Sequence, residues 1–136
     1  DQLCLDATCA IVQALGHEAR PYSDAAAAIR AMTVAAAANH GQVAVISDLT
    51  MPGLNGQAVA EAAFDAGVPC LLLSGGWNWV ALTRAAAVGA RTHDKPCSMA
   101  AIQATLDEFA AAMRAKNLAA AEHAANASSL FSKTKP

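Results

Sequence analysis

Short apolar runs and longer stretches of helical periodicity alternate along this chain. The runs at 43–46 and 68–73 are mostly apolar and are bounded by turn-forming residues. Runs of this length predict strands that are buried on both faces. A weaker and more polar run at 89–94 is predicted as another strand. Residues 17–22 are predicted as a further strand, in which Pro21 is tolerable at a sheet edge because it lacks the backbone donor that an interior strand requires.

Helices are predicted between and around these runs. Apolar spacing and capping residues indicate helices over 2–15, from a Ser23 or Asp24 cap to about residue 39, over 57–66 and over 77–88. A stripe of larger residues predicts a last helix after a Ser98 cap: Met99, Ile102, Leu106, Phe109 and Met113. We interpret 1–116 as one domain and 117–136 as a helical extension, through about residue 125, with a polar tail over 126–136. The alternation predicts an α/β, doubly wound parallel sheet.

Polar residues with chemical potential follow three of the predicted strands. Asp48 ends the run that begins at 43, Ser74 ends the run that begins at 68, and Lys95 follows the polar run. In open parallel sheets, ligands and chemistry collect at the carboxyl ends of the strands. We therefore expect these three side chains to meet at one edge of the sheet.

The segments around these residues resemble the receiver domains of two-component response regulators. Residues 48–56, Asp-Leu-Thr-Met-Pro-Gly-Leu-Asn-Gly, are similar to the phosphoacceptor loop D-x-x-M-P-x-x-x-G. Leu71-Leu72-Leu73-Ser74-Gly75 resembles the fourth strand of that family, and Asp94-Lys95-Pro96 the end of its fifth. The resemblance covers about residues 2–114 and implies a flavodoxin-like receiver fold with strand order 2-1-3-4-5.

This resemblance implies a role for each site residue. Asp48 would accept a phosphoryl group from a histidine kinase or a histidine phosphotransfer protein, with Ser74 and Lys95 contacting the phosphoryl oxygens. Mg²⁺ would be held by Asp48, by the backbone carbonyl of Thr50 and by Asp1, the residue nearest to the family's acidic pair. The chain would be a signalling domain that changes conformation, and not an enzyme beyond slow self-dephosphorylation.

The chain departs from the family pattern in two places. The first strand and its acidic pair are absent from the sequence, which begins without Met near the predicted first helix. An incomplete domain, a strand taken from another molecule or from the chain's own tail, and a remodelled family member are the three explanations. A homodimer with strand exchange is accordingly one predicted assembly. Near Lys95, Thr92 and His93 stand where many receivers have a switching aromatic residue.

Composition narrows the possible partners and compartments. A net charge of −2, without a Lys/Arg stripe, argues against nucleic acid as a partner, and no apolar run is long enough for a membrane span. The cysteines and histidines lack the paired spacing of zinc sites. The cysteines, Cys4, Cys9, Cys70 and Cys97, are therefore expected to be ordinary thiols in a reducing cytoplasm.

Other functions fit parts of the sequence. A degenerate pseudo-receiver would bind a protein partner without phosphorylation, and the missing acidic pair favours it. Trp77 and Trp79 could then belong to a partner surface, or they could pack locally. A hydrolase with Asp48 as its nucleophile is a third alternative, but no general base or substrate pocket can be named for it.

Overall fold

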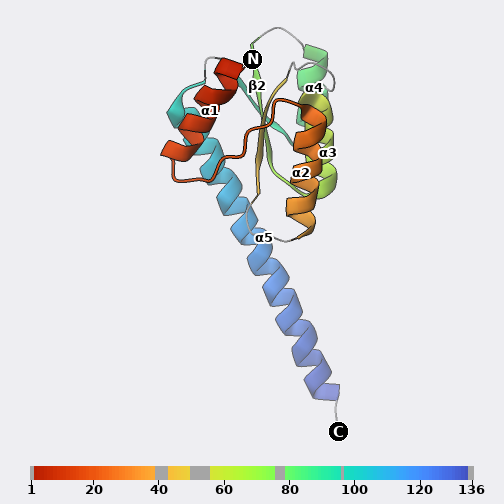
Figure 1. The fold of residues 1–136 in the computed structure, drawn as a ribbon. Coiled ribbons are helices and arrows are strands. Elements are labelled where there is room, and N and C mark those ends of the chain that lie inside the picture. The colour runs from red at the N-terminus through yellow and green to blue at the C-terminus, as the bar shows by residue number, and fades with distance from the viewer. Residues whose placement is uncertain (1, 39–42, 50–55, 76–78, 96, 135–136) are drawn as a thin grey trace.

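Strands and helices alternate along the chain in the arrangement shown in Figure 1. The computed structural model describes residues 2–38, 43–49, 56–75, 79–95 and 97–134. Its helices are α1 (Gln2–Ala14), α2 (Ala25–Ala37), α3 (Gly56–Ala66), α4 (Trp79–Ala87) and α5 (Met99–Thr134). Its strands are β1 (Val45–Asp48), β2 (Cys70–Ser74) and β3 (Arg91–Asp94). All three strands lie within about two residues of the runs from which they were predicted.

The strands form one parallel sheet in the order β1-β2-β3. Val45 is in register with Cys70 and Asp48 with Leu73, while Leu71 is in register with Arg91 and Ser74 with Asp94. Every residue of the central strand β2 is buried. A continuous apolar run is what such a position requires, because helices cover both faces of the sheet.

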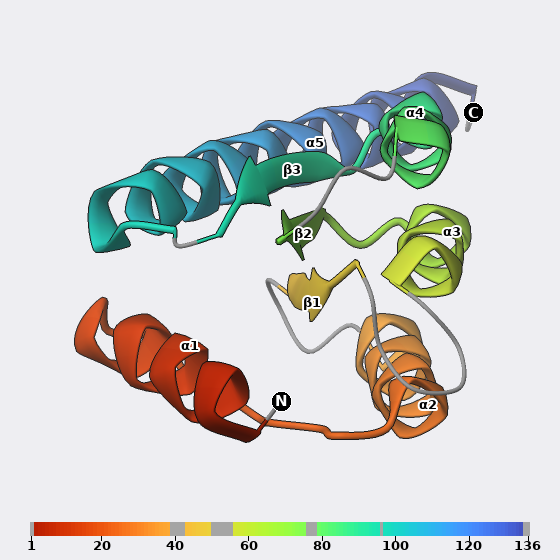
Figure 2. The same cartoon turned by 90° about the horizontal axis from the view of Figure 1, so that it is seen from above.

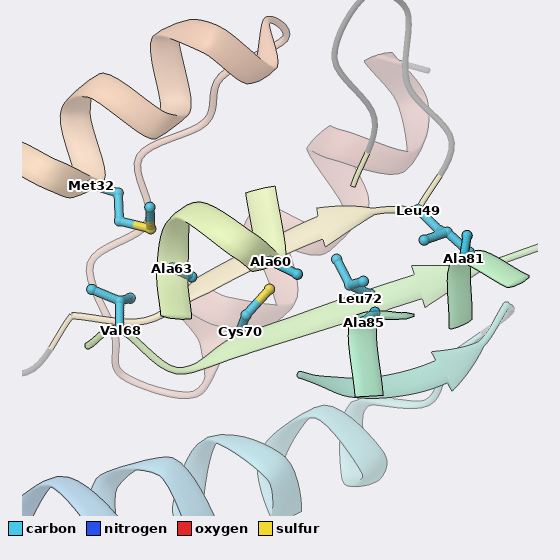
Figure 3. Close-up of a cluster of buried hydrophobic side chains, with 9 residues drawn as sticks. All are labelled: Met32, Leu49, Ala60, Ala63, Val68, Cys70, Leu72, Ala81 and Ala85. Atoms are coloured by element: carbon cyan, nitrogen blue, oxygen red, sulfur yellow. The ribbon is translucent and has the colours of Figure 1, made fainter. Parts of the chain in front are cut away.

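Helices cover the two faces of the sheet in separate groups, as Figure 2 shows: α2, α3 and α4 on one face, α1 and the first part of α5 on the other. Alternate residues of β2 serve the two cores, since successive side chains of a strand point to opposite faces. Cys70 and Leu72 lie in the core under α2, α3 and α4 (Figure 3). Leu71 and Leu73 pack with Ile102 and Phe109 of α5. The doubly wound α/β prediction is confirmed.

The segment 17–22 corrects the sequence analysis, because it contains no strand. Five of its six residues are exposed, and Ala19 is partly buried. The sheet has no strand beside β1 in the described part of the chain, so this segment has no neighbour with which to pair. Glu18 and Arg20 instead form an ion pair with each other at the surface, at 3.1 Å.

The helix ends follow the capping signals of the sequence. The Asp24 carboxylate accepts a hydrogen bond from the Ala26 amide at 3.2 Å, and the Ser98 hydroxyl accepts one from the Ala101 amide at 3.1 Å. Both bonds satisfy amides that have no partner within their helix. Gly67, directly after α3, and Gly89, two residues after the end of α4, adopt positive φ values of 71° and 81°, as helix-terminating glycines do. The predicted caps of α2 and α5 are confirmed.

Helix α5 is much longer than the domain that it covers. Its first part packs on the sheet through Ile102, Thr105 and Phe109, whereas every residue from 114 to 119 is exposed. The helix then projects away from the other elements, as Figure 1 shows. The helix continues past Lys116 as far as Thr134, so it includes most of the segment from residue 126 that was predicted as a polar tail. Its alanines are strong helix formers, which outweigh the polar residues between them.

No described helix combines the length and the apolar character that crossing a membrane requires.

Candidate functional site at the carboxyl edge of the sheet

Three polar side chains come together where the strands end. Asp48 is the last residue of β1, Ser74 is the last residue of β2, and Lys95 directly follows β3. Parallel strands bring these ends to one edge, as predicted from the sequence. The Lys95 amide donates to the Ser74 carbonyl at 2.8 Å. This bond restrains the backbone from which the lysine side chain extends.

A direct ion pair joins Asp48 and Lys95. The Lys95 Nζ lies 2.7 Å from Asp48 Oδ1, and the side chains are 30% and 21% exposed, respectively. Because both groups are partly withdrawn from water, the positive charge of Lys95 is screened less than on an open surface. The arrangement places a cation beside the Asp48 carboxylate, where it can neutralise negative charge on an oxyanion bound at this edge.

Ser74 lies beside this pair and is itself buried, at 4% exposure. Its position at the end of the central strand puts it between the strands that carry Asp48 and Lys95. A hydroxyl can donate one hydrogen bond and accept others, so Ser74 has the chemistry to contact an oxyanion at this edge.

Gly56, the first residue of α3, closes the loop that follows β1. Its amide donates to the Leu49 carbonyl at 2.9 Å. A Cβ built on Gly56 would lie 2.7 Å from the Cα of Leu49, and still closer to the carbonyl oxygen of Asp48. Only glycine permits this approach, so Gly56 fixes where α3 begins relative to the candidate phosphoacceptor. The loop motif contains this glycine, but its steric role could not be derived from the sequence alone.

His93 is a residue near the site to which the sequence analysis gave no partner. It is in register with Leu73, which is in register with Asp48, so the three residues form one row across the sheet. Its Nε2 lies 2.7 Å from the Thr105 hydroxyl oxygen on α5. Thr92, the residue at the position of the family's switching aromatic, is exposed. The sequence pointed to His93 through its position two residues before Lys95, which places both on one face of a strand. Its partner on α5 could not be predicted.

The predicted metal ligands are only partly described. Asp48 is described, whereas Asp1 and Thr50 lie outside the described residues. Among the residues that the structure describes, no three His, Cys, Asp or Glu side chains form a group that could hold a metal ion. The described donor set for Mg²⁺ is therefore the Asp48 carboxylate, which suits a cation that keeps several waters and takes few protein ligands.

The remaining predictions concern thiols and tryptophans. Cys9, Cys70 and Cys97 are free thiols, as expected. Burial raises the pKa of Cys70 to about 12, so this thiol stays protonated and serves as a small apolar core residue. Trp77 lies outside the described residues, and Trp79 is the first residue of α4. A partner surface and local packing stay the two predictions for these tryptophans.

Comparison with known proteins places the fold among receiver domains. No family model matches the chain, and no curated protein matches it. Among solved structures, a response regulator receiver domain protein from Clostridium thermocellum superposes with a TM-score of 0.73 at 20% identity, over 87% of this chain and 92% of that one. The signal receiver domain of a modulated diguanylate cyclase from Desulfovibrio desulfuricans G20 gives 0.71 at 16% identity, over 85% and 90%.

A third similar structure is the signal receiver domain of a putative Luxo repressor protein from Vibrio parahaemolyticus. It has a TM-score of 0.66 at 14% identity, over 82% of this chain and 84% of that one. These similarities cover most of each chain at low sequence identity. They therefore establish the fold, and the chemistry has to be argued from the residues of the site. The chain has the receiver-domain fold that the sequence predicted.

Proposed function

We propose that this chain is a phosphoacceptor domain of a two-component phosphorelay, with Asp48 as the acceptor. The observation that carries the proposal is the 2.7 Å ion pair of Asp48 with Lys95 at the carboxyl edge of the sheet. Functional sites of open parallel sheets form at this edge. The receiver-domain fold supports the same assignment, because such domains act in signalling rather than as catalysts.

The proposed step is an in-line transfer to the carboxylate. An Asp48 oxygen attacks the phosphorus of a phosphohistidine, a new O–P bond forms, and the P–N bond to the imidazole breaks. The departing imidazole nitrogen takes a proton from solvent. Lys95 neutralises charge on one phosphoryl oxygen, and the Ser74 hydroxyl donates to another. The donor would be a sensor histidine kinase or a histidine phosphotransfer protein, which places this domain in the cytoplasm.

Mg²⁺ belongs to the proposal as a cofactor. Asp48, the Thr50 carbonyl and Asp1 would hold it, and it would offset negative charge on the phosphoryl oxygens. Removal of the metal with a chelator is therefore expected to stop transfer to Asp48.

The test is intact mass after incubation with acetyl phosphate, with and without Mg²⁺. We expect a gain of one phosphoryl mass in the wild type with Mg²⁺, and none in Asp48→Asn. Asp65→Asn is the matched control, because Asp65 is an exposed acid on α3 away from the strand ends. A folded wild-type protein that gains no mass would refute phosphoacceptor function and leave the pseudo-receiver, a phosphorylation-independent interaction module.

The edge of β1 that faces away from β2 bears on assembly. Among the described strands β1 pairs with β2, and Ile46 packs partly buried against the same core as Ile11 of α1 and Leu15, which follows α1. The homodimer with strand exchange predicted from the sequence would use this edge, because the edge of a sheet can pair with a strand of another chain. Light scattering coupled to size exclusion decides it: a dimer supports strand exchange, and a monomer at all concentrations contradicts it.

A further inference from the structure

Strand β3 makes successive polar contacts from one side. Arg91, His93 and Lys95 are alternate residues, and alternate residues of a strand lie on the same face. Arg91 and His93 are in register with Leu71 and Leu73, which belong to the core under α5. Arg91 pairs with Glu108 of α5 at 2.6 Å, and His93 contacts Thr105 of α5 at 2.7 Å. The next residue of the series is Lys95, which pairs with Asp48.

The tautomer of His93 decides which group donates in the His93–Thr105 contact. The Thr105 hydroxyl also donates to the Ala101 carbonyl of its own helix at 3.1 Å. Since a hydroxyl has one hydrogen, we infer that its oxygen accepts from the Nε2–H tautomer of His93. Thr105 is buried at 5% exposure, so water has little access to replace the His93 ring as a partner of its hydroxyl oxygen. The contact therefore holds the ring of His93 against α5 more firmly than a surface pair would.

Two contacts restrain the chain around Lys95. His93 lies two residues before Lys95, and the Lys95 amide is bonded to the Ser74 carbonyl at 2.8 Å. The end of β3 is thus attached to β2 by backbone and to α5 by the His93 ring. If the ring is released, the strand end keeps its bonds to β2 but loses its restraint on the side of α5, and the reach of Lys95 toward Asp48 changes. Errors of about 1 Å in the placement of reacting groups can cost up to about 100-fold in rate.

We propose that His93 and Thr105 form a positioning pair that sets Lys95 against Asp48 and so couples the placement of α5 to the phosphoacceptor site. The chemical consequence rests on the proposed phosphoacceptor function, whereas the placement of Lys95 does not. The pair acts through Lys95 and is not itself in contact with the phosphoryl group. The position of α5 thereby influences the placement of Lys95 without direct contact between α5 and the site.

The decisive comparison is Thr105→Val with Thr105→Ser. Valine keeps the volume of threonine and removes the hydroxyl, whereas serine keeps the hydroxyl and removes the methyl group. We expect Thr105→Val to slow phosphorylation of Asp48 by acetyl phosphate about tenfold, within the range that misplacement costs. We expect Thr105→Ser to keep nearly the wild-type rate. A packing role would give the reverse order, with serine the more damaging change, and equal rates in all three proteins would equally overturn the proposal.

Glu108→Gln is the matched control for general loosening of β3 from α5. It removes the exposed Arg91 ion pair on the same strand and helix, at the end of β3 that lies away from Lys95. Exposed ion pairs contribute little, so we expect an unchanged rate. A loss equal to that of Thr105→Val would show that any weakening of this contact slows the reaction, which would overturn a specific role for His93.

A spectroscopic readout separates this inference from the proposed function. We expect the ¹³Cε resonance of Lys95 and the ¹³Cγ resonance of Asp48 to shift in Thr105→Val and to stay in place in Thr105→Ser. The imidazole ¹⁵N signals of His93 should show the Nε2–H tautomer in the wild type and a mixture in Thr105→Val. If the wild type takes no phosphoryl group, the proposed function fails, and these signals still decide the positioning role. Unchanged Lys95 and Asp48 signals in Thr105→Val would overturn it.

Discussion

Replacing Gly56 by alanine tests whether the start of α3 is pressed against the end of β1. The added Cβ would meet backbone atoms, with the Leu49 Cα at 2.7 Å and the Asp48 carbonyl carbon at 2.9 Å. Backbone atoms cannot turn aside as the end of a flexible side chain can. The Asp48 carbonyl also accepts from the Ser47 hydroxyl at 3.0 Å, which further restrains its movement.

The magnitude follows from opposing terms. Overpacking of a well-filled site costs about 1–3 kcal/mol, and weakening the bond from the Gly56 amide to the Leu49 carbonyl adds about 1 kcal/mol. Position 56 is the first residue of α3, so the greater helix propensity of alanine applies there. It offsets up to about 1 kcal/mol of the lost stability. The net expectation is a loss of about 2 kcal/mol in the free energy of unfolding.

Urea unfolding followed by circular dichroism measures this loss. With a slope of about 1.5 kcal/mol per molar urea, the midpoint should fall by roughly 1.3 M at an unchanged slope. Gly75→Ala is the matched control, because within the described ranges a Cβ there would meet only the Lys95 Cδ, at an ordinary 3.7 Å. A Gly56→Ala midpoint equal to that of Gly75→Ala would refute the steric argument.

Three further outcomes follow from single contacts. Lys95→Met should reduce the rate of Asp48 phosphorylation by about 100-fold, as the loss of one charge-stabilising group does. The control Arg20→Met, which removes an exposed cation, should match the wild type in the same mass assay. Ser98→Ala removes the acceptor for the Ala101 amide and should lower the free energy of unfolding by about 1 kcal/mol in the urea assay, whereas Ser98→Asp should retain it. Because the pKa of Cys70 rises from 9.0 to about 12 on folding, an unfolded chain ionises this thiol first, and stability should fall as pH rises from 9 toward 12. Cys70→Ala should show a shallower decline over that range, and an identical decline would contradict the assignment.

The sequence predicted the strand ends better than the strand neighbours. Asp48, Ser74 and Lys95 were placed at one edge because an apolar run and its terminating residue are local signals. The segment 17–22 was predicted as a strand from composition and family analogy, but a strand also needs a partner, which is a property of the whole sheet. The same limit explains His93, whose contact with Thr105 joins residues 12 apart through the packing of a helix on a strand. Gly56 was recognised as part of the loop motif, but its close approach to Leu49 depends on the geometry of the turn.

The length of α5 has a mechanical consequence. The helix spans 36 residues, or about 54 Å at 1.5 Å per residue, and its last 20 or so residues extend about 30 Å beyond the part that packs on the sheet. Such a rod magnifies small rotations: a tilt of about 10° at its base displaces its far end by about 5 Å, the height of one helical turn. An ångström-scale adjustment where β3 meets Thr105 would thus be read out as a displacement several times larger, at a point far from Asp48.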